Sequence, residues 1–497
     1  MPKVNTRHAD YVKFYPEWVR NSDCVAGQSA IKSKGQTYLP MPNSVDKSPE
    51  NLARYQAYLQ RSVFHNVSGR TVENNAGQVF RIVPTIQLPA KLTAFETNID
   101  GHGVGISQQA KDGLKKLLTN SRFGLWVDFP ESNGVVTVKD AEENGIRPKI
   151  LLFDTTQIIN WRVSEYGALS KLSLVVIESD YISNDDEFEA ELKPQWIALR
   201  LIDGIYQVEF WREVDGDFTI FKTVQPQGQD GPFTEIPFKF VGSDSNDHTV
   251  DKPLLSDIAN LNLAHYCDSA DYQEAVYWLG QPTPWISGLT DDWVRDQLKG
   301  GVTMGSRSII PLPVGASAGL LQVSPNTLPK EAMDQKESQM KMLGARLVER
   351  REVAVTATEA GMSEASESSV LADCANNVSN AYGQCFVWAG MFANEDIIYD
   401  PNGLLFELNT EFAVSRITPE EIKAVLEAYN GKLITYEEAR DKLKQGGLAF
   451  VDDALAKQEM DEAADKELDA AMKQFEAQKA TIAPAAAQKP ASNPPNA

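Results

Sequence analysis

Long apolar runs are missing from this sequence of 497 residues. No stretch approaches the roughly 20 consecutive apolar residues that a membrane-spanning helix needs. The first residues, MPKVNTRHADYVKF, also lack the apolar core of a secretion signal. We therefore expect a soluble protein that is not secreted by this route and that has no membrane partner.

Cysteine is scarce, and its four copies, Cys24, Cys267, Cys374 and Cys385, form no C-x-x-C pair. Their spacing predicts neither a structural zinc site nor a disulfide framework. The last two would share a face of one helix but lie about 16 Å apart, which is beyond disulfide reach. We expect four buried thiols in a reducing cytoplasm, with no metal site and no cofactor.

Basic residues are outnumbered, because 47 Lys and Arg stand against 69 Asp and Glu, for a net charge of −22. A protein that grips nucleic acid places cations on the phosphates. The charge balance therefore argues against tight nucleic-acid binding. It allows a protein that lets DNA pass, and it equally suits a protein whose acidic residues only keep it soluble.

Histidine is also scarce, and none of the five copies follows His265. A Ser- and Glu-rich stretch from Arg350 to Gln384 therefore lacks the histidine base that a serine nucleophile normally uses. We expect no catalytic residues there. A carboxylate-dependent hydrolase acting through a pair such as Asp291 and Asp292 is an alternative, but adjacent residues on a helix do not face each other.

The N-terminal part of the chain predicts an α+β domain. Residues 1–145 mix helical and extended patterns. Gly101, Gly103 and Gly105 precede an amphipathic helix but do not fit the G-x-G-x-x-G spacing of a dinucleotide-binding loop. We interpret these glycines as a turn that caps the helix.

Apolar residues alternate from about residue 149 to 240, which predicts an antiparallel meander. Asp203-Gly204 and Asp215-Gly216 fall where tight hairpin turns would lie. Three tryptophans in this stretch could line a sugar site, but packing between half-buried strands is their commoner use. They are Trp161, Trp196 and Trp211.

The second half of the chain predicts two helices around a small insertion. Residues 251–280 form a helix with neighbours on several sides, and residues 329–350 form another. Between them, TPWISGL and SIIPLPV predict strands that flank the short helix DDWVRDQLKGG. The second long helix has a narrow apolar stripe that a partner subunit would cover. The stripe consists of Met333, Met340, Leu343 and Leu347.

A further helix is predicted over residues 368–394, with Ser366 or a nearby serine as its cap. Its apolar face consists of Leu371, Cys374, Val378, Tyr382, Cys385 and Ala389. The opposite face is mainly amide and consists of Asp373, Asn376, Asn377, Asn380 and Gln384. Amides can hydrogen-bond hydrated phosphate without the lasting attraction of a cation. An ordinary solvated face is the alternative.

Many segments, in one order, resemble the portal proteins of tailed double-stranded DNA phages. They are YLPMP, RSVFHNVSGRTVENNAGQVFR, FGLWVDFP, IINW, KPLLSDIANLNLAHYCDSADY, GQPTPWISG, MLGARL and GKLITYEEA. These segments are most similar to one portal-like family that resembles a former domain of unknown function. The resemblance implies the α+β portal fold, with a wing (1–250), a first stem helix (251–280), a clip (281–328), a second stem helix (329–350), a tunnel loop (351–367), a long helix and return strand (368–414), a helical crown (415–478) and a disordered tail (479–497).

The resemblance also implies a non-catalytic ring, usually of about twelve subunits, at one capsid vertex of the virion. Such a ring assembles in the host cytoplasm and lets double-stranded DNA pass, without sequence specificity, during packaging and ejection. Its implied partners are the terminase motor, a head-completion or adaptor protein, and the major capsid or scaffolding protein. A non-phage scaffold or oligomerisation protein is the remaining alternative.

Two sets of residues carry the expected contacts. The tunnel loop has no Lys or Arg from Val353 to Glu367, so its glutamates would repel phosphate and limit its contact with DNA. The predicted DNA-channel residues are Glu359, Glu364, Glu367, Asn376, Asn377, Asn380 and Gln384. The predicted partner-binding residues of the clip are Trp285, Trp293, Ile309 and Ile310.

Overall fold

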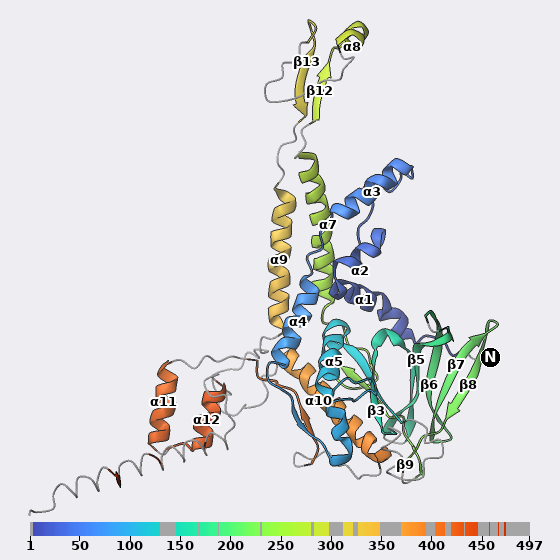
Figure 1. Cartoon of the computed structure of the whole chain (residues 1–497), viewed down its shortest axis with the longest axis vertical. Coiled ribbons are helices and arrows are strands. Elements are labelled where there is room, and N and C mark those ends of the chain that lie inside the picture. Colours follow the sequence, from blue (N-terminus) through green and yellow to red (C-terminus); the bar gives the residue numbers. More distant parts are fainter. Residues whose placement is uncertain are drawn as a thin grey trace, which may run out of the picture. The chain divides into compact units, whose positions relative to one another are not determined.

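The computed structural model divides the chain into two compact units, Met1–Glu411 and Phe412–Ala497 (Figure 1). The described residues are 3–129, 146–166, 169–186, 188–228, 231–279, 283–297, 312–321, 327–347, 369–393, 403–412, 419–431 and 433–445, with the single residues 457, 466, 472 and 473. Within them, no helix is both long enough and apolar enough to cross a membrane.

Four helices open the first unit, α1 (Ala9–Ala26), α2 (Gln28–Ser33), α3 (Pro49–Arg61) and α4 (Val67–Val79). Ser48 caps the start of α3, because its side chain accepts a hydrogen bond from the Asn51 backbone N–H. Pro49 suits the first helical position, because proline lacks the backbone N–H that would have no partner there. Helices α1, α3 and α4 all contact α7 (Ser256–Leu279). The buried cluster among them includes Cys24, Ile31, Tyr55, Phe64, Ala259, Tyr266 and Ala270.

A three-stranded antiparallel sheet forms the second core of this unit, with strand order β11-β2-β3. Its strands are β2 (Arg122–Asp128), β3 (Lys149–Asp154) and β11 (Phe238–Gly242). Helices α5 (Ile106–Asn120) and α10 (Val370–Ala393) pack on it. Gly124 in the central strand has no room for a side chain, since a Cβ there would collide with the Phe238 ring. Two short strands, β1 (Thr85–Gln87) and β14 (Leu405–Glu407), pair with each other. Strand β1 precedes α5 in the sequence, and β14 follows α10.

The glycine-rich stretch before α5 is the predicted cap. Gly105 is the N-cap residue of α5, and Gly101 and Gly103 have φ angles of 86° and 92°. The Asn98 side chain accepts hydrogen bonds from the backbone N–H groups of both Gly101 and Gly103. The glycines are therefore explained by a tight turn that needs left-handed backbone.

The meander is a five-stranded antiparallel sheet in sequence order, and its strands are β4 (Ile158–Tyr166), β5 (Leu169–Asp185), β6 (Ala190–Ile202), β7 (Ile205–Val214) and β8 (Asp217–Val224). Asp203-Gly204 and Asp215-Gly216 make the two predicted tight turns, because all four residues have positive φ, between 53° and 86°. A small hairpin, β9 (Gln227–Gly228) with β10 (Gly231–Pro232), follows.

The predicted meander boundary at residue 149 is wrong. The strand KILLFD is β3, and it pairs with β2 instead of joining the meander. The reason is a 3₁₀ turn, Thr155–Gln157, directly after it. In this turn the Asp154 side chain accepts from the Thr156 N–H, while the Gln157 side chain accepts from the Asp154 N–H, so the chain leaves one sheet before it enters the next.

Helix α7 and helix α9 (Leu328–Arg346) run side by side (Figure 1). Their order is antiparallel, since Asp268 pairs with Lys336 and the earlier His265 meets the later Glu337. The segment between them holds β12 (Thr283–Ser287), α8 (Asp291–Gln297) and β13 (Ser317–Leu321). Because the two helices are antiparallel, the last residues of α7 lie beside the first residues of α9. The insertion therefore connects the two helices at this end of the pair.

The second predicted strand of the insertion is placed differently from the expectation. SIIPLPV was expected to form it, but β12 pairs with residues 317–321 in the later stretch SAGLL. Two prolines in SIIPLPV cannot donate ladder hydrogen bonds, whereas the later stretch has none. Residues 308–311 of the expected strand lie outside the described residues.

The second unit contains two described helices, α11 (Pro419–Asn430) and α12 (Tyr436–Gln445). Thr435 and Glu438 form a capping box at the start of α12, because each side chain bonds the other residue's backbone N–H. Helices are what the crown assignment expects up to residue 445. The rest of that range, apart from four single residues, and the predicted tail 479–497 lie outside the described residues.

Candidate functional site

Helix α10 has the predicted apolar face, and all six of its predicted residues are buried. Ser369 caps the helix, since its side chain accepts from the Ala372 N–H at 3.2 Å. This is the nearby serine of the expectation, and Ser366 itself lies outside the described residues. The Cys374 thiol is buried on this face, and desolvation raises its pKa to about 12, which makes it inert rather than reactive.

The amide face of α10 is divided between exposed and engaged residues. Asn376 and Asn380 are exposed, as a channel surface would require. Asn377 is half-buried, and its side-chain nitrogen donates to the backbone oxygens of Gly242 (2.9 Å) and Ser243 (3.2 Å). Asn377 therefore fixes the turn after β11, and its expected position on a free polar face is corrected.

Gln384 also differs from the expectation of a free polar face. It is half-buried and lines a surface cavity of about 420 Å³ with Lys171, Lys239 and His248. The lining as a whole mixes basic, acidic and apolar side chains, unlike the amide surface that the sequence pattern predicted. The channel-lining assignment thus keeps only Asn376 and Asn380 as exposed residues of this helix, and it stays a prediction for them.

The tunnel-loop residues Glu359, Glu364 and Glu367 lie outside the described residues, so their expected contact with DNA stays a prediction. The same holds for Ile309 and Ile310 of the clip. In the described part of the clip, Trp285 on β12 is 45% exposed and Trp293 on α8 is half-buried. Val294 and Leu320 add exposed apolar surface to the clip.

The aspartate pair of the hydrolase alternative has an ordinary local explanation. Asp291 and Asp292 lie in the first turn of α8, and both are exposed. Arg295 donates to Asp292 at 2.6 Å, one helical turn further on. Acidic residues in a first turn stabilise the helix dipole. Their position is thus accounted for without a reaction.

The stripe on α9 is only in part the expected subunit interface. Met340 is fully buried within this chain, so the expectation that a partner subunit covers it is wrong. The physical reason is that α9 pairs with α7 in the same chain. Met333, Leu343 and Leu347 are half-buried, and for them contact with a second subunit stays a prediction.

The tryptophans of the meander are packing residues, as the commoner interpretation holds. Trp161 and Trp196 are buried. The His8 ring stacks on Trp161 with 4.0 Å between centroids, and the Arg122 guanidinium lies 4.3 Å from the centroid of the Trp161 ring. Trp211 is half-buried and donates to Glu209 at 3.0 Å. These contacts account for the three tryptophans without a sugar.

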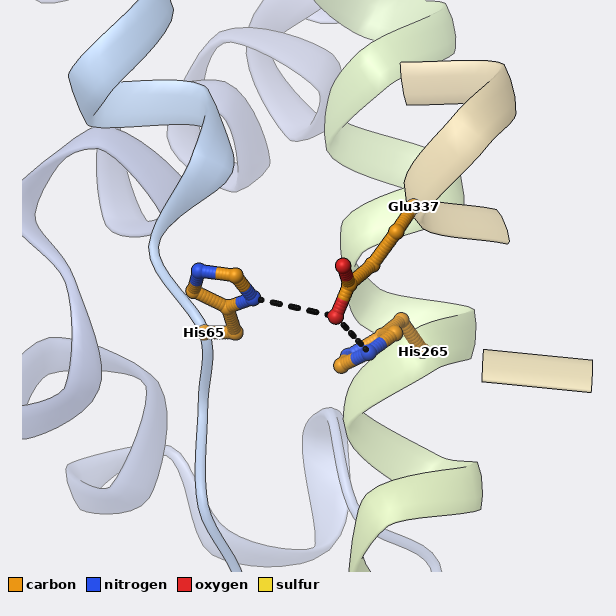
Figure 2. Close-up of side chains that lie close together, drawn as sticks. All are labelled: His65, His265 and Glu337. Atoms are coloured by element: carbon orange, nitrogen blue, oxygen red, sulfur yellow. Dashed lines mark ion pairs between the residues drawn. The ribbon is translucent and has the colours of Figure 1, made fainter. Parts of the chain in front are cut away.

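The first unit also holds a cluster that the sequence pattern did not indicate, formed by His65, His265 and Glu337 (Figure 2). His65 lies between α3 and α4, His265 lies on α7, and Glu337 lies on α9. Glu337 Oε1 is 3.5 Å from His65 Nδ1 and 3.5 Å from His265 Nε2. One ligand atom from each residue lies within 4.8 Å of the other two.

The cluster is open on one side. The side chains of His65 and Glu337 are 43% and 31% exposed, whereas that of His265 is 6% exposed. Burial lowers the pKa of His265, and the Glu337 carboxylate acts in the opposite direction. Sequence spacing could not reveal the cluster, because its three members come from three separate segments that meet only when α9 folds back onto α7.

Comparisons with known proteins give a limited set of similarities. The family model of a domain of unknown function (DUF4055) matches residues 253–393, from α7 to α10. No curated protein matches the chain. Among solved structures, the chain is similar to a chain from the neck of an empty GTA particle computed with C6 symmetry, with 12% identity, a TM-score of 0.39, and coverage of 86% of this chain and 100% of that chain.

Two further structures are similar at the same level. One is a chain from the structure of the virion of a native gene transfer agent (GTA) particle, with 11% identity, a TM-score of 0.37, and coverage of 84% of this chain and 99% of that chain. The other is the neck of a native GTA particle computed with C12 symmetry, with 11% identity, a TM-score of 0.38, and coverage of 78% and 92%.

Proposed function

We propose that this chain is a portal protein, the ring-forming subunit at one capsid vertex of a tailed double-stranded DNA phage or a related particle. The observation that carries the proposal is the order α7, inserted β12–α8–β13, α9 and α10. It is the order of stem helix, clip, stem helix and long helix that the sequence resemblance implies. The antiparallel pairing of α7 with α9 supports the two-helix stem.

Surface chemistry also supports a conduit rather than a nucleic-acid grip. A net charge of −22 gives the chain little means to neutralise phosphates along DNA. Asn376 and Asn380 offer hydrogen bonds without cationic attraction on the exposed side of α10. In this proposal DNA passes the ring without sequence-specific contacts, and the chain performs no catalysis.

The clip is the proposed docking site for the terminase motor and later for a head-completion protein. Its described part exposes Trp285, Val294 and Leu320 on a unit too small to cover them. Several exposed apolar side chains in one short segment are typical of interaction surfaces. The major capsid or scaffolding protein would contact other parts of the ring.

The mass of the purified assembly tests the proposal most directly. Mass photometry of the full chain should show a ring of about twelve subunits, and negative-stain images should show a central channel. Trp285→Ala, a change within the clip, should leave this mass unchanged. A chain that stays monomeric across salt and protein concentrations would rule the portal proposal out.

A further inference from the structure

The geometry points to a divalent transition-metal site formed by His65, His265 and Glu337, taking an ion of the zinc class. This inference does not depend on the portal proposal, because it rests on three side chains of a single chain. Two imidazoles and one carboxylate are a common ligand set for zinc, and three protein ligands leave a further position for water. The exposed side of the cluster gives that water and the ion a way in.

The spacing of Glu337 from both histidines is compatible with three ligands of one ion, and all three ligand atoms lie within 4.8 Å of one another. A tetrahedral zinc ion holds N and O ligands at about 2.0–2.2 Å, which places neighbouring ligand atoms roughly 3.4 Å apart. Both nitrogens lie 3.5 Å from Glu337 Oε1, close to that separation. Hydrogen bonds from N–H to O are typically about 2.7–3.2 Å long, so the same distances are long for direct bonds.

His65 is held in place by contacts that do not use its side chain. The Asn262 side chain on α7 donates to the His65 backbone oxygen at 2.8 Å. Its carbonyl oxygen accepts from the Ser68 N–H and hydroxyl, at 3.1 and 3.0 Å. Asn262 and His265 are one turn apart on α7, so the helix that supplies one ligand also positions the backbone of another. The imidazole of His65 remains available for an ion.

Glu337 is positioned by its own helix pair. Its neighbour Lys336 forms an ion pair with Asp268 on α7, which fixes the height of α9 along α7. Met340, one turn further along α9, is fully buried and fixes the rotation of the helix. Lys341 lies 3.7 Å from Glu337 Oε2, which leaves Oε1 facing the two histidines. The three ligands are thus brought together by packing that exists without an ion.

One feature limits the expected affinity. The buried Nδ1 of His265 has no hydrogen-bond partner in the described part of the chain. Metal-bound histidines usually donate their other N–H to an acceptor, and losing such a partner typically costs about 10–100-fold in metal affinity. We therefore expect a micromolar site rather than a permanently occupied structural one. A bound ion would tie the α3–α4 connection, α7 and α9 together.

Metal titration of the untagged full chain tests this inference. After chelator treatment, titration with Co²⁺ or Zn²⁺ followed by calorimetry should show one ion bound per chain, and bound Co²⁺ should give visible absorption bands. His65→Ala and Glu337→Gln should each weaken binding at least about tenfold. His65 is the first choice because its side chain is substantially exposed, so its removal should not disturb the core.

The matched control is His102→Ala. His102 Nδ1 also lies near a carboxylate, 3.8 Å from Asp100 Oδ2, but without a second histidine, and its side chain is 79% exposed. This variant should bind the ion as the unchanged chain does. Circular dichroism in the absence of metal would show whether each variant is folded. Absence of stoichiometric binding, or equal weakening by His65→Ala and His102→Ala, would overturn the inference.

Discussion

Helices α10 and α9 follow one another in the chain, yet they are used in opposite ways. Most residues of α10 are buried, against the β11-β2-β3 sheet, α5 and β14. Among the described side chains of α9, Met340 alone is buried, and charged residues flank it. The contacts of a helix enclosed by its own chain form when the single chain folds. A helix covered along one line keeps most of its surface for contacts with other molecules.

The largest expected effect comes from the enclosed helix. Phe386 is fully buried in α10, and its ring packs near the rings of Phe95 and Phe406. Phe386→Ala should lower the free energy of unfolding by about 3–5 kcal/mol, because it removes a large ring and leaves a cavity. Met391→Ala, at a 44% exposed position of the same helix, should change it by less than about 0.5 kcal/mol. Urea unfolding followed by tryptophan fluorescence measures both.

A comparable loss from the two variants of α10 would contradict the enclosed position of Phe386. The comparison between the helices would then fail at its first step, because α10 would not belong to the core of the single chain.

The next effect concerns α9 and decides whether its stripe serves the chain or the ring. Met340→Ala should lower the free energy of unfolding of the chain by about 2 kcal/mol, at the low end for a buried methionine, since fewer elements cover α9. Met342→Ala, at a 59% exposed position, should leave it within about 0.5 kcal/mol. If Met340→Ala instead left unfolding unchanged and only dissociated the assembly, Met340 would be an interface residue after all.

Local sequence patterns predicted those features that depend on neighbouring residues. The apolar face of α10, the helices 256–279 and 328–346, and the Asp-Gly turns all follow from periodicity or from backbone conformations that few residues adopt. The long helices were predicted correctly because their apolar residues, spaced at the helical period, are also the residues that pack against the rest of the chain. Helix α7 begins at Ser256, five residues after the predicted start at residue 251, because apolar spacing does not mark the first residue of a helix.

Features that depend on distant segments could not be predicted in this way. The strand KILLFD alternates like the meander strands, and only its pairing with β2, across residues 123–128, assigns it to another sheet. Met340 was assigned to a partner subunit because nothing in the local pattern shows that it is buried within its own chain. The His65, His265 and Glu337 cluster brings together three segments, and no sequence spacing marks such a meeting.

The smallest expected effect separates the two kinds of amide on α10. Asn377 donates two hydrogen bonds to the Gly242 and Ser243 carbonyls, whereas Asn380, one turn away, is exposed. Asn377→Ala leaves those carbonyls without this donor, so we expect a loss of about 1–2 kcal/mol in the free energy of unfolding. Asn380→Ala should change stability by less than about 0.5 kcal/mol, because water replaces its contacts. Urea unfolding of both variants measures the difference.

In the portal proposal, Asn380→Lys should in turn slow DNA packaging by assembled rings without altering their mass, since a cation on the channel surface binds phosphate. Equal stability of the two alanine variants would mean that Asn377 does not fix the turn after β11, and Asn377 would again be available to the channel.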